Sequence, residues 1–301
     1  MRVRQVENWL VMLVLAFLML LCACGADHSP ATADSVTEET SFLTVPTNLD
    51  PKEIVILLYH HITEDVASNS VSVSRFEEHI RALSQEGYTA VSFSQVIDFV
   101  RYGASLPEKP VVITFDDGYE SNLTLAAPIL RKYGMNATIF VIGVSVGKDT
   151  YKDTGVSMIP HFAMEESLEW SDVIWVESHG YDVHEVRGRD EEPIRRGVLP
   201  REGESEDAYI SFLMNDCEMM ADLFQESFGR EPSVFAYPTG RYWDLSEKIL
   251  KDQGFQVTLT TAPHSNWLIP GDASCLYLMG RYSMSEEIDA EQLIYILTDA
   301  S

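Results

Sequence analysis

The sequence predicts an α/β fold with a mainly parallel sheet, and three observations support this class. Short runs of apolar residues lack the alternation of a half-exposed strand, which is typical of strands covered on both faces. Other segments place apolar residues at helical spacing behind capping signals. The two kinds of segment alternate along the chain, and such repeats build parallel sheets whose chemistry lies at the carboxyl ends of the strands.

The composition indicates a folded and strongly acidic protein. The chain has 301 residues, of which 46% are hydrophobic, so it can bury a sizeable core in one large domain or two modest ones. Its 21 basic and 47 acidic residues give a net charge of −26, which opposes binding to nucleic acid and to anionic lipid surfaces. We therefore expect neutral or cationic substrates and no nucleic-acid partner.

The N-terminus has the pattern of an export signal. Arg2 and Arg4 precede an apolar run over residues 9–21, which is too short for a bilayer-spanning helix of roughly 20 residues. The run ends in Leu21-Cys22-Ala23-Cys24, which resembles the bacterial lipoprotein box and implies lipid attachment at Cys24. An ordinary secretory signal or an uncleaved anchor is the alternative.

We expect three segments along the chain. Residues 1–23 form the lipoprotein signal peptide, residues 24–50 a flexible tether, and residues 51–301 one catalytic domain. The predicted location is the extracellular face of the cell membrane, with contact to the membrane through the lipid anchor only. Cys217 and Cys275 could pair after export or stay as buried thiols.

The first half of the domain alternates strand and helix patterns. The apolar run 53–59 begins the sheet, and a capping box at Ser74 begins a helix that ends at Gly87. A second capping box at Ser92 begins the next helix. Further strands are expected at 88–91, 110–115, 136–142 and 173–178, and a further helix at 123–133.

The second half continues this alternation. Apolar residues at helical spacing predict a long helix over 207–228. The remaining strands are expected at 233–237, 255–260 and 275–278, and the remaining helices at 245–253 and 290–297.

Polar side chains follow several of these strands. Asp116 and Asp117 end one strand, and because adjacent carboxylates repel each other, a metal on one of them would relieve that cost. His179 and His184 lie in the loop after another strand, and two imidazoles with one carboxylate are typical of hydrolytic metal sites. A turn at the Asp-Asp-Gly sequence and exposed loop histidines are the alternatives. His60, at the end of the first strand, is a candidate proton donor or an inert rim residue.

Taken in order, these clusters resemble the motifs of the NodB-type polysaccharide deacetylases, carbohydrate esterase family 4. The resemblance runs through Thr114-Phe-Asp-Asp-Gly118, Ser178-His-Gly-Tyr-Asp-Val-His184 and Ala236-Tyr-Pro-Thr-Gly240, and covers most of residues 53–283. The spacing of the two histidines and the early Tyr59-His60 pair are similar to the poly-N-acetylglucosamine deacetylase branch.

The resemblance implies a distorted (β/α) barrel and metal-dependent removal of N-acetyl groups from a cell-surface or biofilm N-acetylglucosamine polymer. It implies that Asp117, His179 and His184 bind a divalent metal, with zinc expected and nickel, cobalt or iron as alternatives. Asp116 would be the general base for the attacking water, and His60 would protonate the leaving amine.

Substrate contacts are expected from the third motif and from one aromatic side chain. The residues of the motif are Tyr237, Pro238, Thr239 and Gly240, and the backbone N–H of Tyr237 would help to hold the oxyanion. Trp267, expected in a loop, is the aromatic candidate for stacking on a sugar ring. We expect a monomer.

The sequence departs from the family pattern at four places. Gly180 replaces the usual Ser or Thr, Ala236 replaces an arginine that braces the base, and Thr239 replaces an aromatic residue. The late Leu-x-His motif is absent, which leaves His60 as the candidate acid. Arg281, close to that missing motif, is expected to pair with a carboxylate or to contact substrate. A glycan-binding lipoprotein without catalysis and an O-acetyl esterase on the same scaffold are the rival functions.

Overall fold

The computed structural model describes residues 50–66 and 69–299. The predicted signal peptide, Cys24 and all but the last residue of the predicted tether lie outside the described residues, so these assignments stay predictions. Over the described ranges, none of the helices combines the length and the apolar character that a bilayer crossing requires.

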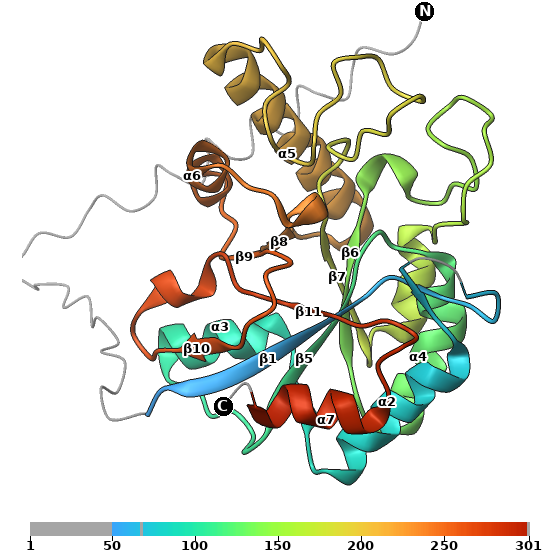
Figure 1. Ribbon diagram of the computed structural model, residues 1–301. Helices are drawn as coiled ribbons and strands as arrows, with labels where there is room; N and C mark the ends of the chain where they lie inside the picture. Colours follow the sequence, from blue (N-terminus) through green and yellow to red (C-terminus); the bar gives the residue numbers. More distant parts are fainter. Residues whose placement is uncertain (1–49, 67–68, 300–301) are drawn as a thin grey trace, which may run out of the picture. The chain divides into compact units, whose positions relative to one another are not determined.

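A nine-stranded sheet forms the centre of the domain, and its main strands run parallel, which confirms the predicted class. The parallel strands lie in the order β1 (Lys52–Tyr59), β5 (Pro110–Phe115), β6 (Ala137–Val141), β7 (Ile174–Ser178), β8 (Val234–Ala236) and β9 (Val257–Leu259). All of these strands end at the same edge, because a helix or long loop returns the chain after each of them (Figure 1).

The segment 279–283 closes this sheet into a distorted barrel. At its start, Met279 bridges to Leu259 of β9, and the N–H of Thr260 donates to the carbonyl of Met279 at 2.8 Å. At its end, β11 (Tyr282–Ser283) pairs in parallel with β1. One short segment therefore bonds to both outer parallel strands, and the distorted (β/α) barrel expected from the resemblance is confirmed.

Short strands complete the edges of the barrel. β10 (Asn266–Leu268) runs antiparallel to the first residues of β1, and β4 (Thr89–Ala90) pairs with β5. β2 (His61–Ile62) and β3 (Ser70–Val71) form a separate two-stranded sheet. The prediction of a strand at 275–278 is wrong, because a 3-10 turn (Ala273–Leu276) begins there instead. The Asp272 carboxylate caps this turn by accepting a hydrogen bond from the N–H of Ser274 at 2.9 Å.

The helices follow the predicted pattern with small shifts at their ends. The capping box at Ser92 is present, whereas α2 is capped by Ser72 instead of Ser74, because the Ser72 hydroxyl accepts from the N–H of Arg75 at 3.1 Å. A π-helical turn (Asn122–Ala126) precedes α4. The helices are α2 (Val73–Gln85), α3 (Phe93–Tyr102), α4 (Ala127–Lys132), α5 (Glu206–Phe228), α6 (Asp244–Asp252) and α7 (Ala290–Asp299), with a 3-10 helix over Met164–Trp170.

Both faces of the central strands are covered. Val55, Leu57 and Tyr59 of β1 pack in a core with α2, α4 and α7, whereas Ile54 and Ile56 pack in a second core with α3. This explains the continuous apolar runs in the sequence, because each strand has a buried neighbour on either side. Cys217 and Cys275 are both free thiols in the structure.

Candidate active site

The paired carboxylates lie where β5 ends. Asp116 is only 3% exposed, and Asp117 follows it with a left-handed backbone, at φ 74°. Aspartate tolerates this conformation better than most residues. Gly118 continues the turn at φ 83°, and a Cβ there would lie 2.9 Å from a methyl carbon of Val141. Both carboxylates lie near His179, whose Nε2 is 3.8 Å from Oδ2 of Asp116 and 3.7 Å from Oδ1 of Asp117.

His179 is oriented by a backbone carbonyl. Its Nδ1 lies 2.7 Å from the carbonyl oxygen of Ala236, so Nδ1 carries the proton and Nε2 is left with a lone pair. That Nε2 lies 3.7 Å from Oδ1 of Asp117. Burial lowers the pKa of His179 to about 4, so the imidazole is neutral near pH 7 and can act as a ligand. Ala236 thus contributes through its backbone.

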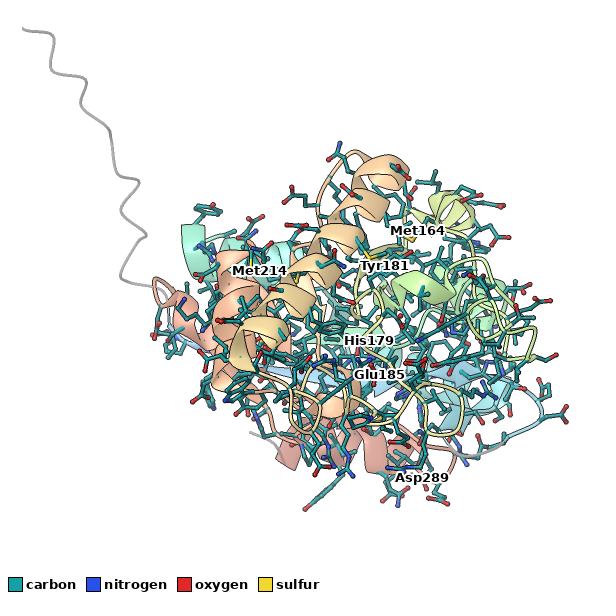
Figure 2. The ribbon with its side chains drawn as sticks, turned by 90° about the horizontal axis from the view of Figure 1, so that it is seen from above. Met164, His179, Tyr181, Glu185, Met214 and Asp289 are labelled. Carbon is teal, nitrogen blue, oxygen red and sulfur yellow. The ribbon has the colours of Figure 1, made fainter. Side chains whose placement is uncertain are left out.

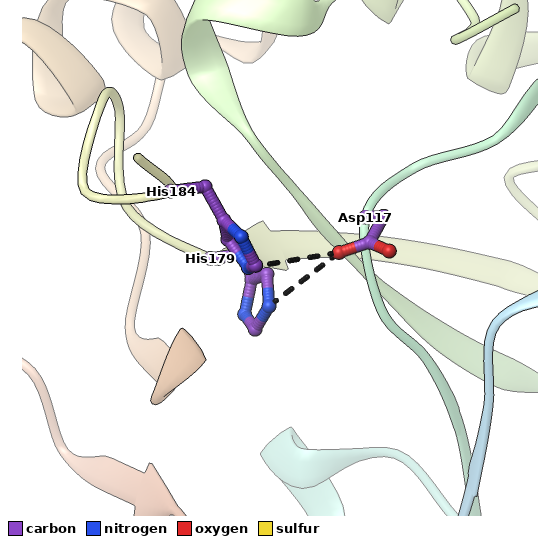
Figure 3. Close-up of side chains that lie close together, drawn as sticks. All are labelled: Asp117, His179 and His184. Carbon is purple, nitrogen blue, oxygen red and sulfur yellow. Dashed lines mark ion pairs between the residues drawn. The ribbon is translucent and has the colours of Figure 1, made fainter. Parts of the chain in front are cut away.

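His184 completes a group of three ligands. Its Nε2 lies 3.8 Å from the same Oδ1 of Asp117, and one potential ligand atom from each of Asp117, His179 and His184 lies within 4.8 Å of the others (Figure 3). The Nε2 of His184 is buried, and no hydrogen bond reaches it within residues 50–66 and 69–299. A buried lone pair without a partner, facing an imidazole and a carboxylate, fits a divalent metal ion.

Arg281 holds Asp116 beside this group. The fully buried guanidinium makes a two-pronged pair with the carboxylate, at 2.7 Å to Oδ1 and 2.8 Å to Oδ2. Burial alone would raise the pKa of Asp116, but the charge and hydrogen bonds of Arg281 hold it far below its usual value. Asp116 is therefore ionised. The expected ion pair of Arg281 is confirmed, and the segment that closes the barrel supplies an arginine where Ala236 lacks one.

Tyr119 is a site residue that the motifs did not reveal. Its hydroxyl donates to Oδ2 of Asp117 at 2.8 Å, so Oδ1 faces the two imidazoles. Burial and the neighbouring Asp117 charge raise the pKa of Tyr119, which keeps the hydroxyl protonated and able to donate. Its position two residues after Asp117 gave no separate signal in the sequence.

Asp216 braces the loop that carries both histidines. Its carboxylate accepts from the N–H groups of Tyr181 at 2.8 Å and Asp182 at 2.6 Å. Figure 2 shows the labelled Tyr181 next to α5, the helix on which Asp216 lies. Gly180 is required here, because at φ 81° a Cβ would lie 2.2 Å from Val183. The loop is thus held by a carboxylate from α5. The sequence signal that could have revealed Asp216 was an aspartate within the apolar stripe of that helix.

A second brace ties the histidine loop to the segment after β6. Lys152 lies 2.9 Å from a carboxylate oxygen of Asp182 and 2.6 Å from one of Asp190. Tyr151 donates to Asp190 and, at 3.4 Å, to the backbone carbonyl of His184. Burial alone would lower the pKa of Lys152, but its bonds to Asp190 and Asp182 raise it, so the ammonium stays charged.

We expect Lys152→Met to lower the metal affinity of the site by about tenfold, because groups that orient metal ligands typically contribute 10- to 100-fold. The measurement is a zinc titration by calorimetry of the wild type and the variant. Lys148→Met is the matched control, since Lys148 lies in the same segment and pairs at 3.5 Å with the exposed Asp153. Equal zinc affinity in the Lys152 variant would remove this residue from the support of His184.

His60 lies beside the two aspartates. It follows β1 directly, is half-buried, and its charge contributes to lowering the pKa values of Asp116 and Asp117. Asn122 holds the backbone there, because its amide donates to the carbonyl of His60 at 2.8 Å. The structure thus brings His60 to the site, and its role as an acid stays a prediction.

The predicted oxyanion donor is wrong in this structure. The backbone N–H of Tyr237 donates to the carbonyl of Leu259 at 2.9 Å, because it belongs to the ladder between β8 and β9. Its hydroxyl donates to Glu247 at 2.6 Å, and the side chain is fully buried. Pro238 is also buried, whereas Thr239 is exposed and Gly240 half-buried, so only the last two offer surface to a substrate.

Trp267 is also misplaced by the sequence prediction. It lies in β10, where it pairs with Glu53 near the first residues of β1, whereas His60 follows the last residue of β1. The two ends of an eight-residue strand are about 25 Å apart. Trp267 is 56% exposed, but it lies at the opposite end of the barrel and cannot stack on a sugar at the site.

The barrel gathers two histidines and two aspartates at the carboxyl ends of its parallel strands, where barrel enzymes have their active sites, and three of these side chains could hold a metal ion. The sequence profile described as "Polysaccharide deacetylase" matches residues 103–258. The chain belongs to the polysaccharide deacetylase family.

Relatives and solved structures agree with this assignment. The chain is 32% identical over 219 residues to the Bacillus subtilis polysaccharide deacetylase homologue YxkH, covering 71% of this chain and 66% of that protein. It is 25% identical over 280 residues to the poly-β-1,6-N-acetyl-D-glucosamine N-deacetylase of Escherichia coli K12, covering 85% of this chain and 40% of that protein. The structure of IcaB from Ammonifex degensii shares the fold, with a TM-score of 0.66 at 24% identity over 82% of this chain and 97% of that chain. The chain thus spans about two thirds of the first relative and less than half of the second.

Proposed function

We propose that the chain is a metal-dependent hydrolase that removes N-acetyl groups from an N-acetylglucosamine glycan. The observation that carries the proposal is the separation of roles at the end of β5. Asp117 faces two imidazoles whose Nε2 atoms lie 3.7 and 3.8 Å from one of its oxygens. Both oxygens of Asp116 are instead bonded by Arg281, and its Oδ2 lies 3.8 Å from Nε2 of His179, beside the ligand group. Relatives named as poly-β-1,6-N-acetyl-D-glucosamine N-deacetylases support the choice of substrate.

Asp117, His179 and His184 would hold the metal, and zinc is the ion expected for this ligand set. When bound, the ion supplies Lewis-acid polarisation of the acetamide carbonyl and makes water a better nucleophile.

The residues around that site provide the proton transfers. Arg281 contacts both oxygens of Asp116, yet each carboxylate oxygen has a second lone pair, so the ionised Asp116 can still accept the proton of the attacking water. An amine leaves poorly unless it is protonated, and His60, next to both aspartates, would donate that proton. Tyr119 keeps Asp117 turned toward the imidazoles throughout.

We also propose that the protein acts as a monomer at the extracellular face of the membrane, anchored through lipid on Cys24. The support for the anchor and the location is the sequence pattern of residues 1–24 alone, and the monomer is an expectation without structural support. Labelling with a palmitate analogue, compared between wild type and Cys24→Ala, tests the anchor.

The direct test of the activity is acetate release from N-acetylglucosamine oligomers and peptidoglycan. We expect release that stops when a chelator removes the metal and returns when zinc is added. Release from O-acetylated substrates only would establish the esterase function instead. Binding of the glycans with no release from any of them, by protein with metal bound, would establish a binding protein.

We expect His184→Ala to lose zinc affinity by more than about 100-fold, because loss of a ligand costs more than loss of a group that only orients one. Calorimetric titration measures the affinity, and acetate release should fall in parallel. His264→Ala is the matched control, since His264 is exposed and its Nδ1 bonds to the carbonyl of Ser265 at 2.8 Å. Unchanged zinc binding in the His184 variant would contradict the proposed ligand set.

A further inference from the structure

A pocket of about 350 Å³ lies directly beside Asp117 and His184. Its walls come from the segment after β6 and from the loop that follows His184. An acetyl methyl group is about as large as one water molecule, roughly 30 Å³, so the pocket has room for much more than the group to be removed. The apolar part of the lining consists of Ile142, Val144, Met158, Ile159 and Val186.

Arg189 is the basic residue of this pocket lining. Its guanidinium lies 5.1 Å from the ring centroid of Tyr151, which holds the charge at the pocket wall. No carboxylate within the described ranges forms an ion pair with Arg189, whereas Arg187 on the same loop pairs with Glu192 at 3.1 Å. The neighbouring Asp190 is already bonded to Lys152 and Tyr151.

Apart from the proposed metal site, the acidic groups of this region do not offer a further site for a cation. Asp117 is directed at the two imidazoles and accepts from Tyr119, and Asp190, which lies outside the pocket lining, is bonded to Lys152 and Tyr151. Arg189 is therefore the charged side chain of the pocket lining that has no ion-pair partner within the described ranges, although the whole chain carries a net charge of −26. An anionic ligand at this pocket would differ from the neutral or cationic substrate expected from composition.

We propose that the pocket binds an acidic side group of the glycan, a short carbon chain that ends in a carboxylate. The carbon chain packs against the apolar wall, and Arg189 takes the carboxylate in a charge-assisted hydrogen bond. The inference rests on the proposed N-deacetylase function, and it adds that the preferred polymer carries a carboxylate on a sugar next to the one that reacts.

The test uses two oligosaccharides that differ in one charge. In one, the sugar next to N-acetylglucosamine carries a 3-O-lactyl ether with a free carboxylate, and in the other that carboxyl is a methyl ester. Both kcat/KM for acetate release and binding by surface plasmon resonance are measured on the zinc-loaded full chain. We expect the wild type to favour the free acid by about tenfold, which is typical of one charge-assisted hydrogen bond.

Arg189→Gln should reduce this preference to within about twofold, whereas the control Arg187→Gln should keep it. A wild type that treats acid and ester alike, or an Arg189 variant that keeps the preference, would overturn the inference. Acetate release from both oligomers without a preference leaves the deacetylase function intact and refutes the acidic subsite alone. An Arg189-dependent binding preference without acetate release from any glycan refutes the deacetylase function and supports the subsite.

Discussion

Asp116→Asn should lower kcat/KM for acetate release by about 10²- to 10⁴-fold, the range that one general base contributes. The amide cannot accept the proton of the attacking water, whereas Asp117, His179 and His184 stay in place. We therefore expect zinc affinity within about threefold of wild type. Acetate release and zinc titration on the same preparations measure the two effects.

This substitution also affects stability, because Arg281 is fully buried and loses its charge partner. Breaking a buried ion pair by removing one partner costs about 3–5 kcal/mol, whereas replacing both partners by uncharged groups is often neutral. The double variant with Asp116→Asn and Arg281→Met should thus regain thermal stability but not turnover. An active Asp116→Asn protein, or a double variant that regains activity, would show that Asp116 is not the base.

The sequence was most informative where apolar pattern and motif coincide. The runs at 53–59 and 110–115 predicted β1 and β5 closely, because strands buried on both faces have little room for polar residues. The alternation of strands and helices placed Asp116, Asp117, His179 and His184 at one edge of the sheet, because parallel strands end together. The proximity of these four side chains could therefore be predicted from the chain alone, whereas their roles as base and ligands rested on the family resemblance.

The residues that hold this group in place were much harder to predict. Arg281 reaches Asp116 only because segment 279–283 closes the barrel, and two-residue pairing such as β11 has no sequence pattern. Asp216 and Lys152 both contact the histidine loop from positions about 30 residues away in the sequence, and nothing near either of them in the chain indicates that contact. The Tyr237 prediction failed for the same reason, since the partner of its N–H belongs to a distant strand.

Arg281→Met should destabilise the protein by about 3–5 kcal/mol, because it leaves the buried Asp116 carboxylate without its partner. Arg281 also donates to the carbonyl of Thr260 at 2.9 Å, so the barrel closure loses a contact as well. The stability of Arg281→Lys should lie between that of the wild type and that of Arg281→Met, since an ammonium cannot bond both carboxylate oxygens in the same plane. Thermal and denaturant unfolding of the zinc-loaded protein measure the change, and the exposed Arg241→Met is the matched control.

The pH dependence separates a positioning role of Arg281 from a purely structural one. The folded-state pKa of Asp116 lies below its unfolded value, so this ion pair stabilises the wild type above about pH 4 and is lost only in stronger acid. Without Arg281, burial raises the pKa of Asp116, and the base takes up a proton at a higher pH. The acid limb of kcat/KM should therefore move to higher pH in Arg281→Met and stay in place in Arg241→Met. An Arg281→Met protein that is less stable but keeps the wild-type acid limb would mean that Arg281 supports the barrel without tuning Asp116.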